Sequence, residues 1–266
     1  MIRILTKADE KSVLEYLYNE PQINIFIIGD IENFGFDVDF QDIYGEFENN
    51  QYTSVLLRYR SNVIYYCHNE YFNTEWLPII KDINPEFISG KKTLTDLILA
   101  YFPTYQEKTM YFSEATALDK SLPVENETVT RVTTKEEIGL VFDLLITITE
   151  FDSMKNATRE KHIEEHIHYL EHSALMMITE NGKCVSTAAT VADTTKSAMV
   201  VAVATDRSAR NKGYASKVMI SLMDEYINNR CKSLCLFYDN PKAGKIYKRL
   251  GFKGIDQWVM LIRKND

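Results

Sequence analysis

A strand-like apolar run leads into a cationic, glycine-containing turn whose residue types bind phosphate. The β-branched and small apolar residues 199–203 predict a strand buried on both faces. From Tyr214 onward, apolar residues recur at helical spacing, so the turn forms the N-terminus of a helix. Backbone N–H groups and the positive end of the helix dipole converge there, and Gly213 allows close approach of an anion. With the charges of Arg210 and Lys212, the turn predicts a phosphate-binding site.

The turn at 210–215, Arg-Asn-Lys-Gly-Tyr-Ala, resembles the R/Q-x-x-G-x-G/A pyrophosphate-binding signature of the GCN5-related N-acetyltransferases, or GNAT proteins. The resemblance continues through a strand at 234–237, an N-x-x-A helix start at 240–243 and a Y-x-x-L-G-F helix end at 247–252. Ala215 stands where many members have glycine, a replacement that the family tolerates. This ordered set of motifs is more specific for the family than the turn alone, which could occur by chance in many proteins. The ending and the divergent N-terminal half are similar to the FR47-like and glycine N-acyltransferase-like branch.

The resemblance implies an N-acetyltransferase that moves the acetyl group of acetyl-CoA directly to a primary amine of a small molecule or peptide. The cofactor is expected in a splay between the strand ending at Thr205 and the strand 233–238. Backbone groups of Val203 and Thr205 are implied to pair with the pantetheine arm, which Asn240 also contacts. The residues implied for the pyrophosphate are Arg210, Asn211, Lys212, Gly213, Tyr214, Ala215 and Ser216. A protein that senses acetyl-CoA or another ligand without turnover is the alternative.

Tyr247 matches the tyrosine that acts as general acid in many GNAT proteins. A phenol is chemically suited to protonate a departing thiolate. The spacing of Ala243, Ile246, Tyr247 and Leu250 also predicts one apolar face of a helix, which would make Tyr247 a core residue. The sequence is compatible with Tyr247 as a general acid and with Tyr247 as a core residue.

The general base is the least defined part of the predicted site. Many GNAT proteins carry a glutamate on the central strand, whereas residues 197–205 contain no carboxylate. Glu150 and Asp152 lie in a polar loop at 150–156, where the acceptor commonly enters, and are the candidate bases. The alternatives are that both are solvated loop charges, or that water molecules deprotonate the amine.

Two histidines suggest a zinc site, which is an interpretation that competes with acyl transfer. His162 and His166 belong to an H-x-x-E-H pattern like that of inverted zinc peptidases. No third ligand with a matching context is evident, so no metal site is predicted. An amphipathic helix that buries Ile163, Ile167 and Leu170 explains the pattern, and a role of either histidine in a substrate cleft is the alternative.

The order of predicted elements indicates an α/β protein, with a mixed sheet, built from two tandem domains of the GNAT acyltransferase type. The first domain, 1–113, repeats the order of the second but reads His-Asn-Glu-Tyr-Phe at 68–72, where the signature belongs. We therefore expect a degenerate domain that does not bind the cofactor. Residues 114–128 are the expected linker, and 129–266 the catalytic domain.

Charge is divided unevenly between the halves. Residues 1–128 carry 10 Lys and Arg against 21 Asp and Glu, whereas residues 129–266 carry 20 against 17. The acidic half aids solubility, or draws a cationic amine towards the protein. The acidic net charge of −8 and the absence of a basic stripe argue against nucleic acid as a partner.

No apolar run in the sequence reaches the roughly 18 residues of a membrane span, so no membrane partner is expected. The N-terminus lacks a secretory apolar region, which favours a cytoplasmic protein. The four cysteines form no C-x-x-C pair and are expected to be buried free thiols. A homodimer is left open.

Overall fold

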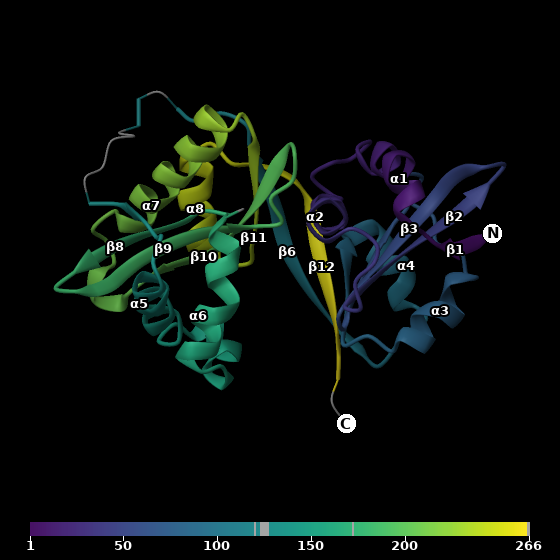
Figure 1. The fold of residues 1–266 in the computed structure, drawn as a ribbon, viewed down its shortest axis with the longest axis horizontal. Helices are drawn as coiled ribbons and strands as arrows, with labels where there is room; N and C mark the ends of the chain where they lie inside the picture. The colour runs from purple at the N-terminus through teal and green to yellow at the C-terminus, as the bar shows by residue number, and fades with distance from the viewer. Residues whose placement is uncertain (120, 123–127, 172, 265–266) are drawn as a thin grey trace. The chain divides into compact units, whose positions relative to one another are not determined.

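The computed structural model describes residues 1–119, 121–122, 128–171 and 173–264. It divides into two compact units (Figure 1). Unit 1 contains Met1–Ser113, Phe237–Asn240 and Gly254–Asp266, and unit 2 contains Glu114–Leu236 and Pro241–Lys253.

Unit 1 follows the predicted order of strands and helices. Its sheet has the strand order β1-β2-β3-β4-β5-β12-β6. The elements are β1 (Ile2–Ile4), α1 (Glu10–Leu17), α2 (Ile25–Phe34), β2 (Gln41–Glu48), β3 (Gln51–Tyr59), β4 (Asn62–Tyr66), α3 (Trp76–Ile83), β5 (Phe87–Lys91), α4 (Lys92–Leu99), β6 (Tyr105–Ala115) and β12 (Lys253–Arg263). The isoleucines of α2 at positions 25, 27, 28 and 31 are buried.

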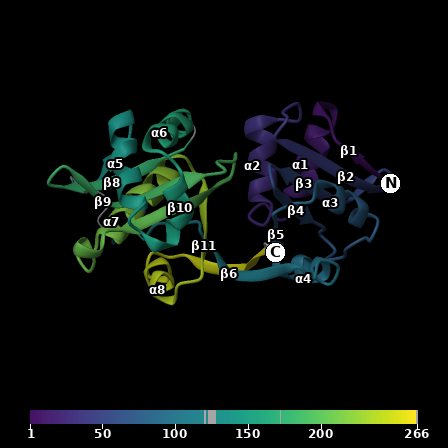
Figure 2. The ribbon, with the colours of Figure 1, turned by 90° about the horizontal axis from the view of Figure 1, so that it is seen from below.

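Unit 2 repeats this order, and its sheet runs β11-β10-β9-β8-β7. Figure 2 shows the strands β8 to β11 of this sheet. The elements are β7 (Thr130–Arg131), α5 (Lys135–Leu145), α6 (Arg159–Ile167), β8 (Leu175–Glu180), β9 (Lys183–Val191), β10 (Ser197–Thr205), α7 (Tyr214–Met223), β11 (Ser233–Tyr238) and α8 (Pro241–Arg249). The central strand β10 pairs parallel with β11 and antiparallel with β9. The predicted mixed α/β fold with two copies of one element order is confirmed.

The last strand completes the sheet of unit 1. β12 pairs antiparallel with β5, from Trp258 opposite Lys91 to Ile262 opposite Phe87. The predicted domain 129–266 includes this strand, whereas in the structure most of its residues belong to unit 1. The linker predicted at 114–128 contains residues 120 and 123–127, which lie outside the described part of the chain.

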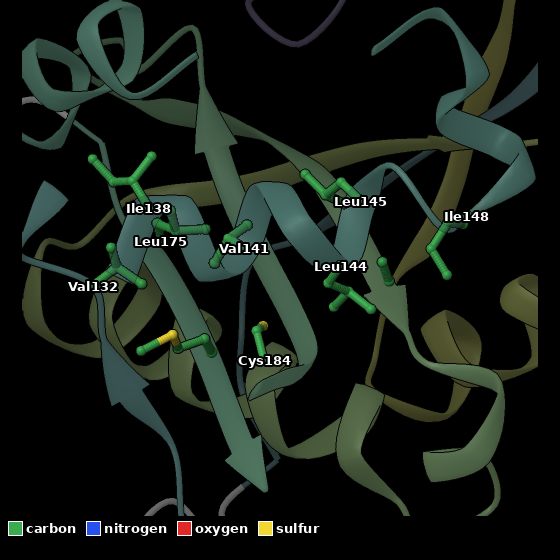
Figure 3. Close-up of a cluster of buried hydrophobic side chains, with 10 residues drawn as sticks. Val132, Ile138, Val141, Leu144, Leu145, Ile148, Leu175 and Cys184 are labelled. Atoms are coloured by element: carbon green, nitrogen blue, oxygen red, sulfur yellow. The ribbon is translucent and has the colours of Figure 1, made fainter. Parts of the chain in front are cut away.

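The core of unit 2 forms between α5 and the sheet. The Thr134 side chain accepts a hydrogen bond from the Glu137 N–H, and the Glu137 carboxylate accepts one from the Thr134 N–H, which together form a capping box at the start of α5. Apolar side chains of α5 face the strands (Figure 3). The buried cluster comprises Val132, Ile138, Val141, Leu144, Leu145, Ile148, Leu175, Met177, Cys184 and Ala204. Because Ala204 belongs to this cluster, the core holds the end of β10 in place.

Three local predictions are corrected by the structure. The polar loop expected at 150–156 forms 3₁₀ turns over Thr149–Asn156. The amphipathic helix expected to include Leu170 changes to a 3₁₀ turn at His168, with its α-helical part ending at Ile167. Cys231 is exposed, whereas the other three cysteines are buried as expected. No helix in the described part of the chain is both long and apolar enough to cross a membrane.

Candidate functional site

The end of β10 has an irregular backbone. Its pairing with β11 stops at Val200 opposite Leu236, five residues before β10 ends. Its register with β9 shifts between Val201 and Ala204, and Ala202 adopts a positive φ of 53°. A β-bulge of this kind redirects the strand and leaves backbone groups unpaired on one side. The predicted pantetheine contacts, Val203 and Thr205, lie in or just beyond this bulge.

Side chains around the bulge fix its last residues. The Ser186 hydroxyl on β9 donates to the Ala204 carbonyl at 3.1 Å and lies 2.9 Å from the Thr205 hydroxyl. The Arg210 guanidinium donates to the Thr205 carbonyl at 3.3 Å. Arg210 therefore links the end of β10 to the turn that follows.

The turn before α7 is open and has a backbone that suits an anion. Asn211 and Gly213 both adopt positive φ, 65° and 81°, and alternating conformations of this kind point successive N–H groups to one side. The Lys217 N–H donates to the Gly213 carbonyl, so the N–H groups of residues 214–216 precede the helical hydrogen-bond ladder. A Cβ atom built on Gly213 meets no atom within 4 Å. The space beside this glycine is free for a bound group.

One carboxylate at the end of β8 binds two side chains of this site. Both Glu180 oxygens lie 3.1 Å from Lys212 Nζ, and the Tyr214 hydroxyl donates to the same carboxylate. The Tyr214 hydrogen bond and the Lys212 ammonium hold the pKa of Glu180 below its usual value. Nζ of Lys212 and of Lys217 lie 5.6 and 5.7 Å from the centroid of the Tyr214 ring. Sequence reasoning missed Glu180.

A further cation reaches the first turn of α7 from α8. Arg249 Nη2 donates to the Ser216 hydroxyl at 2.7 Å, although α8 lies far along the chain from the turn. Residues 214–216 therefore have a guanidinium beside them in addition to Arg210 and Lys212. The motif match had included this arginine only as an unassigned position in Y-x-x-L-G-F.

Tyr247 lies on the buried face of α8. Its side chain is 7% exposed, and its ring packs against Phe252 at a centroid distance of 6.0 Å. Burial raises the pKa of Tyr247 to about 12, so the phenol carries its proton at neutral pH. The predicted apolar face of α8 is confirmed, and the acid role stays a prediction. Asn240 is exposed and directly precedes α8.

The candidate bases lie in the 3₁₀ segment Thr149–Asn156. Glu150 is exposed, and the side chain of Asp152 lies outside the described ones. No interaction joins Glu150 to the bulge or to the turn in the described part of the chain. The assignment of a base therefore stays a prediction.

The two histidines of α6 form a packed pair. The rings of His162 and His166 stack at 3.8 Å, and Phe142 lies 5.0 Å from His162. His162 is buried, and desolvation followed by the charge of His166 lowers its pKa to about 4. Among the described residues, no group of three His, Cys, Asp or Glu side chains could hold a metal ion. His162 is thus packed as a neutral side chain of unit 2.

Comparison with known proteins identifies the family of the second half. Residues 142–252 match the model of the acetyltransferase (GNAT) family, and this range contains β10, the turn, α7 and Tyr247. These residues form a GNAT domain. No curated protein matches the sequence.

Solved structures extend the similarity in fold over nearly the whole chain. A protein from Drosophila melanogaster has a TM-score of 0.71 at 9% identity and covers 99% of both chains. A GCN5-related N-acetyltransferase-like protein from Streptococcus suis has a TM-score of 0.60 at 15% identity, covering 97% of this chain and 100% of its own. A tandem GNAT protein from the clavulanic acid biosynthesis pathway has a TM-score of 0.61 at 9% identity, covering 100% and 99%. The chain thus has the tandem GNAT fold.

Unit 1 differs from the GNAT domain at the matching turn. Its loop after β4 contains no glycine, and the start of α3 is linked to a buried carboxylate of the chain itself. Glu46 accepts from the Ser54 hydroxyl at 2.5 Å, from the Trp76 indole at 3.2 Å and from the Asn73 amide. A carboxylate at this helix start disfavours a second anion there.

Proposed function

We propose that the protein transfers the acetyl group of acetyl-CoA directly to a primary amine of a small molecule or peptide, using the GNAT domain. The observation that carries this proposal is the open turn at 210–216, with two left-handed residues and its N–H groups at the start of α7, following a bulged β10. The family match supports acyl transfer in general.

The residues of the turn fit a pyrophosphate group. The N–H groups of residues 214–216 would donate to its oxygens, and Arg210, Lys212 and Arg249 would balance its charge. Val203 and Thr205 would offer backbone groups of the bulge to the pantetheine arm, with Asn240 as a further contact. When bound, acetyl-CoA supplies the activated acetyl group. Asn211 and Gly213 would supply the left-handed backbone that the turn needs.

We assign Tyr247 as the general acid for the leaving thiolate. Its raised pKa keeps the proton available at neutral pH. Glu150 and Asp152 are the proposed bases, with water as the other route for the amine proton. Direct transfer is favoured over a cysteine-bound acyl group, because burial raises the pKa of Cys184 to about 12 and that of Cys235 still further.

A protein that binds acetyl-CoA without turnover is the second candidate. The burial of Tyr247 favours it, because a side chain 7% exposed has little access to a leaving group. The two candidates share the cofactor turn and differ only in the release of free CoA when an amine is present.

The test begins with calorimetric titration of acetyl-CoA into the full chain and into Gly213→Val. Valine at a φ of 81° is strained, and its side chain would fill the space beside the turn, so we expect at least a tenfold loss of affinity, about 1.4 kcal/mol. Gly35→Val is the matched control, since Gly35 also has a positive φ and open space but lies in unit 1. Absent binding to the unaltered chain would overturn the proposal. The release of free CoA thiol is then measured with acetyl-CoA and a panel of amines. Release indicates an enzyme, and binding without release indicates a sensor.

The location, the binding partners and the oligomeric state of the protein stay proposals. A cytoplasmic location and the absence of a nucleic-acid partner come from the sequence alone. The same amine panel identifies the amine acceptor. Light scattering measures whether the protein is a homodimer.

A further inference from the structure

Unit 1 contains a cavity of about 360 Å³ that the proposed acyl transfer does not use. It is lined by residues of α1, of the β2–β3 hairpin and of the loop after β4. Small-molecule sites in proteins measure roughly 300 to 1,000 Å³, so the cavity has room for a small ligand. None of its lining side chains is aliphatic. They are Tyr16, Glu48, Asn49, Gln51, Tyr52, Thr53, His68 and Asn69.

Two tyrosine rings of the cavity lining are fixed by their neighbours. The rings of Tyr16 and Tyr52 stack at a centroid distance of 5.6 Å and an interplanar angle of 27°. The Tyr16 hydroxyl donates to the Thr53 carbonyl at 2.7 Å and accepts from the His68 N–H at 3.2 Å. The Tyr52 hydroxyl lies 3.3 Å from the Ser12 hydroxyl. Because both hydroxyl groups have partners in unit 1, the rings are held in place before a ligand binds.

The imidazole in the cavity lining is oriented through one of its nitrogens. His68 Nδ1 lies 3.4 Å from Glu20 Oε2 and 3.3 Å from the Tyr66 hydroxyl. The same carboxylate accepts from the Tyr66 hydroxyl and from Lys91 Nζ, each at 3.0 Å, so the Glu20 side chain is itself fixed. These contacts leave His68 Nε2 available to donate to a ligand or to accept from it.

The other side chains of the lining offer hydrogen-bonding groups without a positive charge. Four of them are exposed and have no side-chain hydrogen bond within the part of the chain that the structure describes: Glu48, Asn49, Gln51 and Asn69. An amide both donates and accepts, and a carboxylate accepts. No Lys or Arg is among the described residues that line the cavity, so it does not favour a phosphate or carboxylate ligand. The lining therefore fits a neutral molecule with several hydroxyl groups.

We propose that unit 1 binds a pyranose sugar in this cavity, with a C–H face of the sugar packed against the rings of Tyr16 and Tyr52. The sugar hydroxyl groups, which both donate and accept, would bind the amides of the lining, the Glu48 carboxylate and His68. The C–H groups on one face of a pyranose form an apolar surface, and an aromatic ring removes such a surface from water. This site lies in unit 1, and its existence does not depend on acyl transfer.

The histidines provide a direct readout, because His68 is the only one of the five in residues 1–113. The full chain, labelled with carbon-13 at histidine Cε1, is titrated at pH 8 with the methyl pyranosides of glucose, galactose, mannose and N-acetylglucosamine. The spectrum of His68→Gln assigns the His68 resonance by its loss. We expect this resonance to shift with saturation for at least one pyranoside, while the other four resonances stay in place. Sorbitol, which has hydroxyl groups but no ring face, and adenosine should leave all five unchanged.

Variants identify the amides and the ring. Gln51→Ala and Asn69→Ala each remove an exposed amide and are expected to weaken binding by about threefold to tenfold. Tyr52→Leu should weaken binding by about tenfold, and its melting temperature verifies that it folds. The matched control is Gln106→Ala, which removes an exposed amide of β6 outside the cavity and should bind like the unaltered chain.

Three results would each overturn the proposal. The first is the absence of a saturable shift of the His68 resonance with any of the four pyranosides. The second is a saturable shift with sorbitol, or with adenosine alone, which would assign the cavity to another class of ligand. The third is equal binding of the pyranoside by the unaltered chain, Gln51→Ala and Asn69→Ala.

Discussion

Both carboxylate oxygens of Glu180 lie 3.1 Å from Lys212 Nζ, so a cation of the cofactor turn is already paired with an anion of the chain. The ion pair is partly exposed, with side-chain exposures of 34% and 46%. A pyrophosphate arriving at the turn would therefore share Lys212 with Glu180 and meet a nearby negative charge.

Removing this charge is expected to strengthen cofactor binding. Glu180→Gln keeps a hydrogen-bond acceptor for Tyr214 while it removes the repulsion of phosphate, and we expect acetyl-CoA to bind about threefold to tenfold more tightly at low salt. Calorimetry at two salt concentrations measures this gain, which should shrink at high salt. Weaker binding by the variant would instead assign Glu180 the role of orienting Lys212.

Arg249 is expected to contribute to the same site through its position beside Ser216. Arg249→Gln should lower the affinity for acetyl-CoA by about fivefold to tenfold, because a cation next to three free N–H groups is lost. Lys253→Gln is the control, since it removes an exposed cation of unit 2. Equal losses in the two variants would indicate a general effect of net charge.

Tyr247→Phe tests proton delivery. The change keeps the buried ring and removes the hydroxyl, so we expect turnover to fall by about a hundredfold or more with little change in KM and in melting temperature. Tyr226→Phe is the comparison, because Tyr226 is fully buried and its hydroxyl binds Thr190 and Asp193. That variant should lose stability and keep its turnover. An unchanged turnover in Tyr247→Phe removes the acid role.

The pH dependence of the free energy of unfolding tests the protonation state of the Asp30 carboxyl group. Its pKa in the folded state, about 7, lies above the ordinary value of 3.8, so the folded state binds more protons than the unfolded state between these two pH values. The free energy of unfolding should therefore fall as pH rises from about 4 to about 8. Asp30→Asn should equal the unaltered chain at pH 4 and exceed it at pH 8 by about 2 to 4 kcal/mol. Urea unfolding at several pH values measures the difference, and parallel pH curves would contradict it.

The local elements of the site could be predicted from the sequence because they are encoded by neighbouring residues. The apolar run at β10, the glycine of the turn and the spacing on α7 and α8 each lie within one short segment. The capping box at Thr134 and the hairpin of β8 and β9 are formed by equally local residues.

Other features depend on contacts between distant segments, and the sequence pattern does not contain them. Glu180 and Arg249 reach the turn from a hairpin and from the last helix, so only the folded chain reveals them. The bulge places an alanine, Ala202, at positive φ, a conformation that usually indicates glycine or asparagine. The alternation of apolar and polar residues in β12 predicts a strand but not the strand with which it pairs. That strand is β5 of unit 1.

The place of β12 affects how the chain can fold during synthesis. β12 lies between β5 and β6 in the sheet of unit 1, yet a ribosome makes it after every element of the GNAT domain. Until then β5 and β6 lack a strand between them and present unpaired edges, which are prone to aggregation. Unit 1 is started first and finished last, so a nascent chain should need a chaperone while the GNAT domain is being made.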